Sequence, residues 1–253
     1  MATLYLVSTP IGNLDDLSPR AAEVLRTVPR ILAEDTRRSR VLADRVGSEA
    51  ALVSVHEHNE RGRAAQIVGW LDGGEDLALV TDAGTPLVSD PGERVVDAVV
   101  AAGHAVTPIP GPSAPLAALV ASGLPAERFT FLGFPARKGR NRDADLARVA
   151  ESQETVILFE SPQRLVRLLE DLEARCEPGR RVCVAREVTK LHEEFVRGTL
   201  PEALGYYREH APRGEVTVVV APTGATEDPD VVMQRARALA TEPDLIVLDE
   251  PVS

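Results

Sequence analysis

The sequence predicts an α/β fold, with a largely parallel sheet in its first half and a second α/β unit after it. Short apolar runs alternate with helical patterns along the chain. Three of these runs lead into loops rich in glycine and proline, at 8–16, 81–92 and 108–119. Because the carboxyl ends of parallel strands lie at one edge of a sheet, such loops predict one shared ligand site there.

In the first unit, Ser18 followed by Pro19 marks the start of the first helix. A serine side chain caps free amides, and proline lacks the amide that the first helical position leaves unused. We expect strands at 3–7, 30–33, 51–55, 77–80 and 105–109. Between them we expect helices at 19–27, 36–46, 61–71 and 93–102.

The second unit begins with a helix at 115–121, and further helices connect its strands. The edge strands of this unit are expected to be antiparallel. Its strands are expected near 129–132, 155–159, 181–185 and 215–220. The SGLP turn at 122–125 is the nearest marker of a boundary, so we expect domains at 1–120 and 121–224 and an atypical tail at 225–253.

The loop at 81–92 has the composition of a ligand-binding turn. Gly84 and Gly92 can adopt backbone angles that are closed to other residues, and Pro86 stiffens the turn. Asp82 and Asp90 add carboxylates beside it. An ordinary connection between a strand and a helix remains the alternative.

Composition sets further bounds. With 253 residues and 44% hydrophobic content, the chain can bury a large core. No run approaches the roughly 18 apolar residues of a membrane span, and no basic leader precedes an apolar stretch, so we expect no membrane partner and a cytoplasmic location. Cys176 and Cys183 are the two cysteines, and both are interpreted as structural.

The formal net charge of −11 disfavours non-specific attraction to phosphate backbones, and we expect no DNA partner. Two local basic patches remain, and solvated surface is the alternative for both. The first comprises Arg37, Arg38, Arg40 and Arg45. The second is ARKGRNR at 136–142, expected to be a mobile loop.

Several common motifs are absent. The chain has neither the GxxxxGK[ST] phosphate loop nor the GxGxxG dinucleotide fingerprint. Ser113 lacks the flanking glycines of a hydrolase nucleophile. His56 and His58 would share one face of a strand, but no third ligand lies near them, so we expect no metal and interpret them as cleft lining or surface residues.

Seven motifs in a fixed order go beyond composition. They are TPIGNLDD (9–16), AEDTR (33–37), HEHN (56–59), DAGTPLVSDPG (82–92), PIPGPSA (108–114), ESPQR (160–164) and AREVTKLHEE (185–194). Over residues 3–222 this series resembles the rRNA 2'-O-methyltransferases of the tetrapyrrole methylase superfamily, which modify a cytidine of 16S rRNA. The resemblance implies two α/β domains with S-adenosylmethionine in the cleft between them, a homodimer, and the small ribosomal subunit as partner.

The same resemblance implies that strand-end loops bind the methyl donor. Phe159 is expected against the adenine, with core packing as the alternative. The implied donor-binding residues are Pro10, Asp82, Ala83, Gly84, Thr85, Pro86, Ser113 and Phe159.

Methyl transfer to a ribose hydroxyl needs a group that takes its proton or a cation that favours the oxyanion. The matched motifs offer Lys190, Glu187, Arg186 and Asp35. We favour Lys190 and Glu187, which follow an apolar strand, and an ion pair that only ties the strand end is the alternative. For RNA contacts we expect Arg37, His58, Asn59, Arg137, Lys138 and Arg140.

Two other functions stay open: a methylase of the same superfamily that acts on a small molecule, and a catalytically silent RNA-binding or ribosome-assembly factor. The target nucleotide and the need for an assembled subunit are also open. The segment 232–253 resembles the stretch leading into a Walker B strand, with Asp249 and Glu250 at its end. Without a phosphate loop, we expect no ATPase activity.

Overall fold

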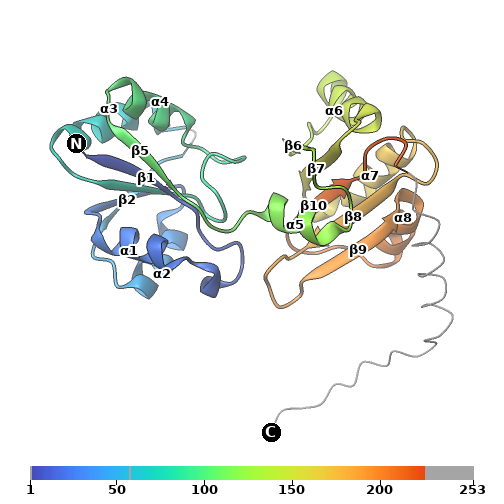
Figure 1. Cartoon of the computed structure of the whole chain (residues 1–253), viewed down its shortest axis with the longest axis horizontal. Helices are drawn as coiled ribbons and strands as arrows, with labels where there is room; N and C mark the ends of the chain where they lie inside the picture. Colours follow the sequence, from blue (N-terminus) through green and yellow to red (C-terminus); the bar gives the residue numbers. More distant parts are fainter. Residues whose placement is uncertain (1, 57, 226–253) are drawn as a thin grey trace, which may run out of the picture.

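The computed structural model describes residues 2–56 and 58–225, which form two α/β domains (Figure 1). Each domain is built around a sheet of five strands. Within the described residues, no helix is long and apolar enough to cross a membrane. The tail from residue 226 onward, with Asp249 and Glu250, lies outside the described residues.

The first sheet is parallel throughout and has the order β3-β2-β4-β1-β5. Its strands are β1 (Thr3–Val7), β2 (Arg30–Ala33), β3 (Ala51–Ser54), β4 (Leu77–Val80) and β5 (Ala105–Ile109). Its helices are the short 3-10 turn η1 (Leu14–Asp16), α1 (Pro19–Thr27), α2 (Thr36–Val46), α3 (Glu60–Asp72) and α4 (Glu93–Ala101).

Side chains alternate along each strand between the two faces of this sheet. Ile31 and Ala33 pack with α1 and α2, whereas Leu32 packs with α3 and α4. Figure 1 shows these two helix pairs on opposite faces. Because helices cover both faces of this sheet, the loops that can contact a ligand lie at its carboxyl edge.

The second sheet is mixed and has the order β6-β7-β10-β8-β9. Its strands are β6 (Phe129–Gly133), β7 (Thr155–Glu160), β8 (Arg181–Arg186), β9 (Glu194–Thr199) and β10 (Val216–Val220). Strands β6 and β7 pair in parallel, and the other neighbouring pairs are antiparallel. One face packs against α6 (Gly139–Glu151), α7 (Pro162–Glu173) and α8 (Leu200–Glu209), and the other against α5 (Ala114–Ser122).

The expected elements of the first domain are confirmed to within one residue at each end. The Ser18 side chain accepts a hydrogen bond from the Ala21 amide at 3.1 Å, so it caps α1 as expected. In the second domain, β9 is not among the strands that the sequence predicts. The expectation about strand direction holds for the edge strand β9 but is wrong for the edge strand β6, and the central strand β10 is antiparallel to both its neighbours.

Helix α5 packs with the second domain. Ala118 and Leu119 belong to the same buried cluster as Ile157, Cys183 and Val219 of the second sheet. This packing favours a division between the domains ahead of α5, at 110–113. The division expected at 120/121 stays a prediction.

Candidate functional site

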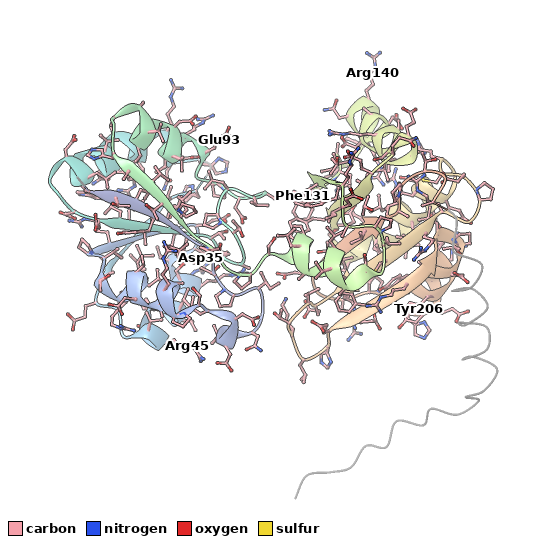
Figure 2. All side chains as sticks on the ribbon, viewed as in Figure 1. Asp35, Arg45, Glu93, Phe131, Arg140 and Tyr206 are labelled. Atoms are coloured by element: carbon pink, nitrogen blue, oxygen red, sulfur yellow. The ribbon has the colours of Figure 1, made fainter. Side chains whose placement is uncertain are left out.

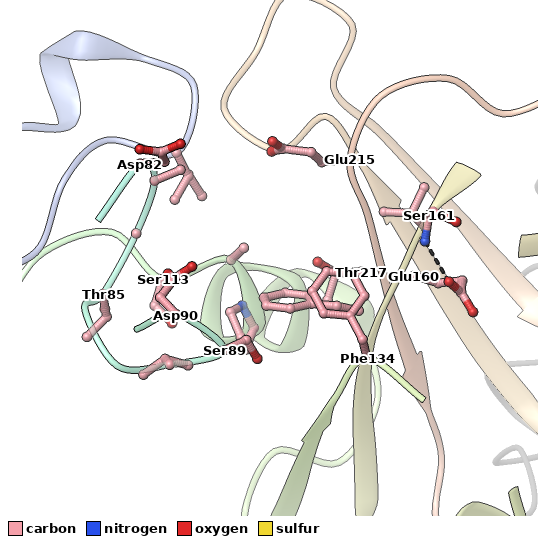
Figure 3. A pocket seen from close by; sticks show the side chains of 18 of the residues that line it. Asp82, Thr85, Ser89, Asp90, Ser113, Phe134, Glu160, Ser161, Glu215 and Thr217 are labelled. Carbon is pink, nitrogen blue, oxygen red and sulfur yellow. Dashed lines mark hydrogen bonds between the residues drawn. The ribbon is translucent and has the colours of Figure 1, made fainter. Parts of the chain in front are cut away.

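A cavity of about 390 Å³ lies between the two domains, where their sheet edges face each other (Figure 3). From the first domain it takes Ile11, Arg38, Asp82, Ala83, Gly84, Thr85, Val88, Ser89 and Asp90; from the connection and α5 it takes Ser113, Ala114 and Pro115. From the second domain it takes Phe134, Phe159, Glu160, Ser161, Pro162, Gly214, Glu215, Val216 and Thr217.

The loop after β4 is held by the loop after β1. Thr9 and Gly84 exchange two backbone hydrogen bonds, of 2.8 and 3.0 Å. Gly84 has a φ of 87°, and a side chain there would meet Ile11. These contacts fix the backbone that forms the first-domain wall of the cavity.

Asp82 joins this loop to the start of α2. Its Oδ1 accepts a hydrogen bond from the Asp35 amide at 3.1 Å, and its Oδ2 lies 3.3 Å from the Arg38 guanidinium. The carboxylate of Asp82 therefore orders the wall as well as lining it.

Six of the expected donor-binding residues line the cavity together: Asp82, Ala83, Gly84, Thr85, Ser113 and Phe159. Pro10 and Pro86 are not among its lining residues, although Ile11 and Thr85 beside them are. Pro86 is buried. The structure thus brings most of this set to one place, and its role in binding stays a prediction.

Phe159 packs against other aromatic rings and also lines the cavity, and its contact with adenine stays a prediction. Its ring packs edge-on against Phe131, with centroids 5.0 Å apart, and lies 5.3 Å from Phe134. Phe134, which is 58% exposed, also lines the cavity. The second-domain wall therefore offers an aromatic surface suited to a flat, apolar ring.

The cavity is acidic. Figure 3 shows Asp82 and Glu215 on opposite sides of it, with the Glu215 carboxylate extending toward Asp82. Burial raises the pKa of Asp90, and repulsion by Asp82 adds to the effect. Burial, together with repulsion by Asp82 and Asp90, likewise raises the pKa of Glu34. A bound cation would relieve this repulsion.

Lys190 and Glu187 form one network with Glu215. The Lys190 Nζ lies 2.8 Å from Glu187 Oε1 and 3.0 Å from Glu215 Oε2. Glu187 Oε1 also accepts a hydrogen bond from the Glu215 amide at 2.9 Å. The stem of Lys190 packs so closely against Gly12 of the first domain that a Cβ there would collide with it. The network therefore sits where the domains meet.

The charges of this network support each other. Burial alone would lower the pKa of Lys190, but hydrogen bonds to Glu187 and Glu215 outweigh it and raise the pKa. Burial alone would raise the pKa of Glu187, and the hydrogen bonds from Lys190 and the Glu215 amide lower it. At neutral pH Lys190 is a cation and Glu187 an anion.

Asp35 and Arg186 lie apart from this network. Asp35 caps α2 and binds the Arg37 guanidinium at 2.7 Å, and these hydrogen bonds lower the pKa of Asp35 to about 2. So weak a base is a poor acceptor for a hydroxyl proton at neutral pH. Arg186 binds Glu194 at 3.1 Å and does not line the main cavity.

The residues expected to contact RNA differ in their exposure and in whether their side chains already have partners within the protein. The Arg37 side chain is 89% exposed but paired with Asp35. The side chain of Asn59 accepts a hydrogen bond from the His56 backbone amide and donates one to the Ser54 carbonyl oxygen. Both hydrogen bonds hold the loop to which Asn59 belongs. His58 is exposed, with its ring 6.0 Å from that of His56.

The second basic patch is only partly a loop. Arg137 and Lys138 are exposed, but α6 begins at Gly139, so Arg140 stands on its first turn (Figure 2). The expectation of a mobile loop reaching residue 142 is therefore wrong. Arg142 is buried and binds Asp171 at 2.6 Å.

Within the described part of the chain, no group of three or more histidine, cysteine or acidic side chains is placed to hold a metal ion. Cys176 and Cys183 are free thiols, and burial raises the pKa of Cys183 to about 11. A thiol of that kind is inert at neutral pH.

Sequence reasoning missed the lining residues Ser89, Phe134, Glu160, Ser161 and the segment 214–217. The sequence signal for ligand contacts is a loop after the carboxyl end of a strand, and the segment 214–217 lies at the amino end of β10 instead. Strand β10 runs antiparallel to β7 and β8, with Val216 opposite Glu160 and Arg186, so its amino end reaches this edge. The residues that precede β10 could have been found only once its direction was known.

Three comparisons with known proteins bear on this site. Residues 3–204 match the family described as Tetrapyrrole (Corrin/Porphyrin) Methylases. The chain is 46% identical over 228 residues to Ribosomal RNA small subunit methyltransferase I of Synechocystis, covering 90% of this chain and 81% of that protein. It is 48% identical over 221 residues to the protein of the same name in Xylella fastidiosa, covering 86% and 81%.

Among solved structures, the chain resembles uroporphyrin-III C-methyltransferase from Thermus thermophilus complexed with S-adenyl homocysteine. The TM-score is 0.62 at 19% identity, and the match covers 86% of this chain and 97% of that one. At this identity the likeness extends to the fold alone.

Proposed function

Since this chain belongs to the tetrapyrrole methylase family, we propose that it transfers a methyl group from S-adenosylmethionine to the ribose 2'-hydroxyl of a cytidine in 16S rRNA. It is an S-adenosylmethionine-dependent rRNA methyltransferase. The observation that carries this conclusion is that relatives 46% and 48% identical, matched over most of their length, bear the name of a small-subunit rRNA methyltransferase.

The cavity fits the methyl donor. S-adenosylmethionine supplies an electrophilic methyl group on a positively charged sulfur. The aromatic wall of Phe134 and Phe159 suits its adenine, and the carboxylates of Asp82, Asp90 and Glu215 suit its positive charge. Because Thr9 holds Gly84 by two backbone hydrogen bonds, the first-domain wall has a fixed shape against which the donor can lie.

For catalysis, we assign Lys190 the role of the cation that favours the ionised ribose oxygen. That oxygen would form a bond to the methyl carbon as the bond from this carbon to sulfur breaks, which leaves neutral S-adenosylhomocysteine, and the hydroxyl proton would pass to water. Its raised pKa keeps it protonated at neutral pH, which suits a cation and not a proton acceptor. Of the three members of this network only Glu215 lines the cavity, and Lys190 reaches the edge of the cavity through its ion pair with Glu215, whereas Glu187 binds Lys190 and the Glu215 amide. Glu187 therefore acts as a positioning residue for Lys190, and Asp35, which is bound to Arg37, as a structural cap.

The contribution of the fold is alignment. The two walls of the cavity come from different domains, joined by the segment ahead of α5 and by the contact of Gly12 with Lys190. Holding two reactants in line supplies a large part of the acceleration of such a reaction.

The first test is incubation of the chain with labelled S-adenosylmethionine and small ribosomal subunits that lack this modification, followed by nucleoside analysis. We expect label in 2'-O-methylcytidine. Label in another nucleoside would contradict the cytidine assignment. Label in a tetrapyrrole and none in RNA would favour the small-molecule methylase, and donor binding without transfer to either would favour the silent RNA-binding factor.

We also propose that the chain acts as a homodimer. Leu116 and Val120 lie one turn apart on the outer side of α5 and are 48% and 76% exposed, an apolar surface suited to a second copy. Sedimentation should show a dimer that Val120→Lys dissociates. The matched control is Val100→Lys on α4, at a site 59% exposed, and it should leave the dimer intact.

A further inference from the structure

A second, smaller cavity of about 150 Å³ lies in the second domain. One chain segment lines both cavities, because Arg213 borders the small one and Gly214 and Glu215 border the large one. Arg186 also lines the small cavity, and Glu187, the next residue, belongs to the Lys190 network. Pockets for whole small-molecule ligands are typically about 300–1,000 Å³, so this one has room for a single flat fragment.

The small cavity has an aromatic wall. The rings of Tyr206 and His210 are stacked, with centroids 4.4 Å apart and planes 16° apart. His210 Nδ1 lies 3.0 Å from the Tyr206 carbonyl oxygen, which fixes the imidazole, and His210 is exposed. Tyr206, labelled in Figure 2, donates its hydroxyl hydrogen to Glu194 at 2.8 Å. The wall is therefore held in place before any ligand arrives.

The charged groups of this cavity differ in how many hydrogen-bond partners they have. Glu194 accepts hydrogen bonds from Arg186 at 3.1 Å and from the hydroxyls of Tyr206 and Tyr207, so it is already satisfied. Arg213 is exposed, and no carboxylate of the described residues pairs with its guanidinium. One positive charge next to the aromatic wall is thus available to a phosphate.

We propose that the small cavity binds one unstacked base of the RNA substrate, from the nucleotide next to the methylated one. This inference rests on the proposed function. His210 stacks on the base and Arg213 contacts the phosphate beside it. Unpaired RNA bases are commonly held by stacking on aromatic side chains, histidine included. Because residues 213–215 link the two cavities, a base held here would bring the neighbouring ribose to Glu215 and Lys190. His210 and Arg213 are then positioning residues.

The first experiment measures methyl transfer to small ribosomal subunits by the full chain. His210→Ala should raise the KM for subunits about 5- to 100-fold, the range expected for loss of one stacked base, and leave the affinity for S-adenosylmethionine unchanged. His210→Phe keeps a flat ring and should restore most of the loss. Arg213→Ala should also raise KM. The control Arg208→Ala removes an exposed charge of α8 that pairs with Glu170, and it should have no effect.

The second experiment measures binding of a short oligocytidylate and of a ribose-phosphate chain of equal length without bases. The wild-type chain should prefer the oligocytidylate, and His210→Ala should lose that preference while His210→Phe keeps it. An unchanged KM in both His210→Ala and Arg213→Ala, or an unchanged preference in His210→Ala, would overturn the proposal. If wild-type protein methylates no RNA, the proposed function is wrong, and the binding experiment still decides whether this cavity holds a base.

Discussion

Among the described residues, four that are not glycine have a left-handed backbone, and they fall in two loops next to the main cavity. Leu87 and Ser89 have φ of 70° and 66° in the loop after β4, and Glu187 and Thr189 have φ of 50° and 69° in the loop after β8. Such backbone is costly, above all for a β-branched residue like Thr189. Strained backbone in both loops is expected for a functional site, because such a site holds its residues in defined positions.

Lys190 should be needed for turnover and not for donor binding. Replacing Lys190 by alanine removes the cation that we assign to the ribose oxygen, so kcat should fall about 100- to 1,000-fold, as for loss of one oxyanion donor. Calorimetry should find the affinity for S-adenosylmethionine preserved. The matched control is Arg148→Ala, which removes an exposed cation from the last turn of α6. A near-normal kcat in Lys190→Ala would make Lys190 structural.

The ion pair between Lys190 and Glu187 predicts that the stability of the folded chain depends on pH. The pKa of Glu187 is lowered below its ordinary 4.5, so its contribution is complete above that value and is lost as pH falls through the lowered pKa. The pKa of Lys190 is raised above 10.5, so its contribution is complete below that value and is lost as pH rises through the raised pKa.

Glu187→Gln should therefore lower the free energy of unfolding by about 1–2 kcal/mol, because the pair is largely shielded from water. Urea titrations should find this difference constant from about pH 5 to 10 and smaller on either side. A difference that changes steadily across the neutral range would mean that another group titrates with the pair.

At the scale of elements, Glu60 connects the two helices that cover one face of the first sheet. It is buried at the start of α3, and its Oε1 accepts hydrogen bonds from the amides of Arg94 and Val95 at 2.7 and 3.3 Å. Gly92, which precedes α4, has no side chain to cap that helix. Glu60 supplies the missing cap and so anchors the end of the loop that lines the cavity.

Replacing Glu60 by alanine should lower the free energy of unfolding by about 1–3 kcal/mol, because the amides of Arg94 and Val95 lose their hydrogen-bond acceptor. Glu93→Ala, an exposed change in the first turn of the same helix, should shift stability by less than about 1 kcal/mol. Thermal unfolding of both variants measures the difference. Equal effects would show that the helix dipole, and not the cap, accounts for the loss.

At the scale of the whole molecule, an acidic chain has to bind an acidic polymer. Because the net charge is −11, we expect RNA affinity to come from local basic groups, and we propose Lys138 and Arg140, which are exposed at the start of α6. Each phosphate contact with single-stranded RNA contributes about 0.7 to the slope of log affinity against log salt.

The double variant Lys138→Ala with Arg140→Ala should weaken RNA binding and reduce that slope by about 1–1.5, with donor affinity unchanged. The control removes Arg128 and Arg148, two exposed arginines of the same domain, one directly before β6 and one in the last turn of α6. Filter binding over a range of salt measures both. If the control changes the slope as much, general charge and not this patch governs RNA affinity.

Local sequence signals were sufficient for most elements and for part of the site. Ser18 and Pro19 mark the start of α1 because capping depends on neighbouring residues alone, and the loop from Asp82 to Thr85 lines the cavity because its glycine and acidic residues sit directly after a strand. Asn59 shows the limit, since its amide is occupied within its own loop. A polar residue type does not reveal which partner it has found in the fold.

The sequence by itself determined the α/β class, the order of the first sheet's elements, the family and the Lys190 and Glu187 motif, because each is written in neighbouring residues or in ordered motifs. Tertiary structure decided which side chains share a wall. The direction of β10 brings Glu215 to Lys190, the packing of α5 joins it to the second sheet, and Tyr206 meets His210 beside Arg213. These contacts join residues distant in sequence or depend on the backbone path, so no local pattern encodes them.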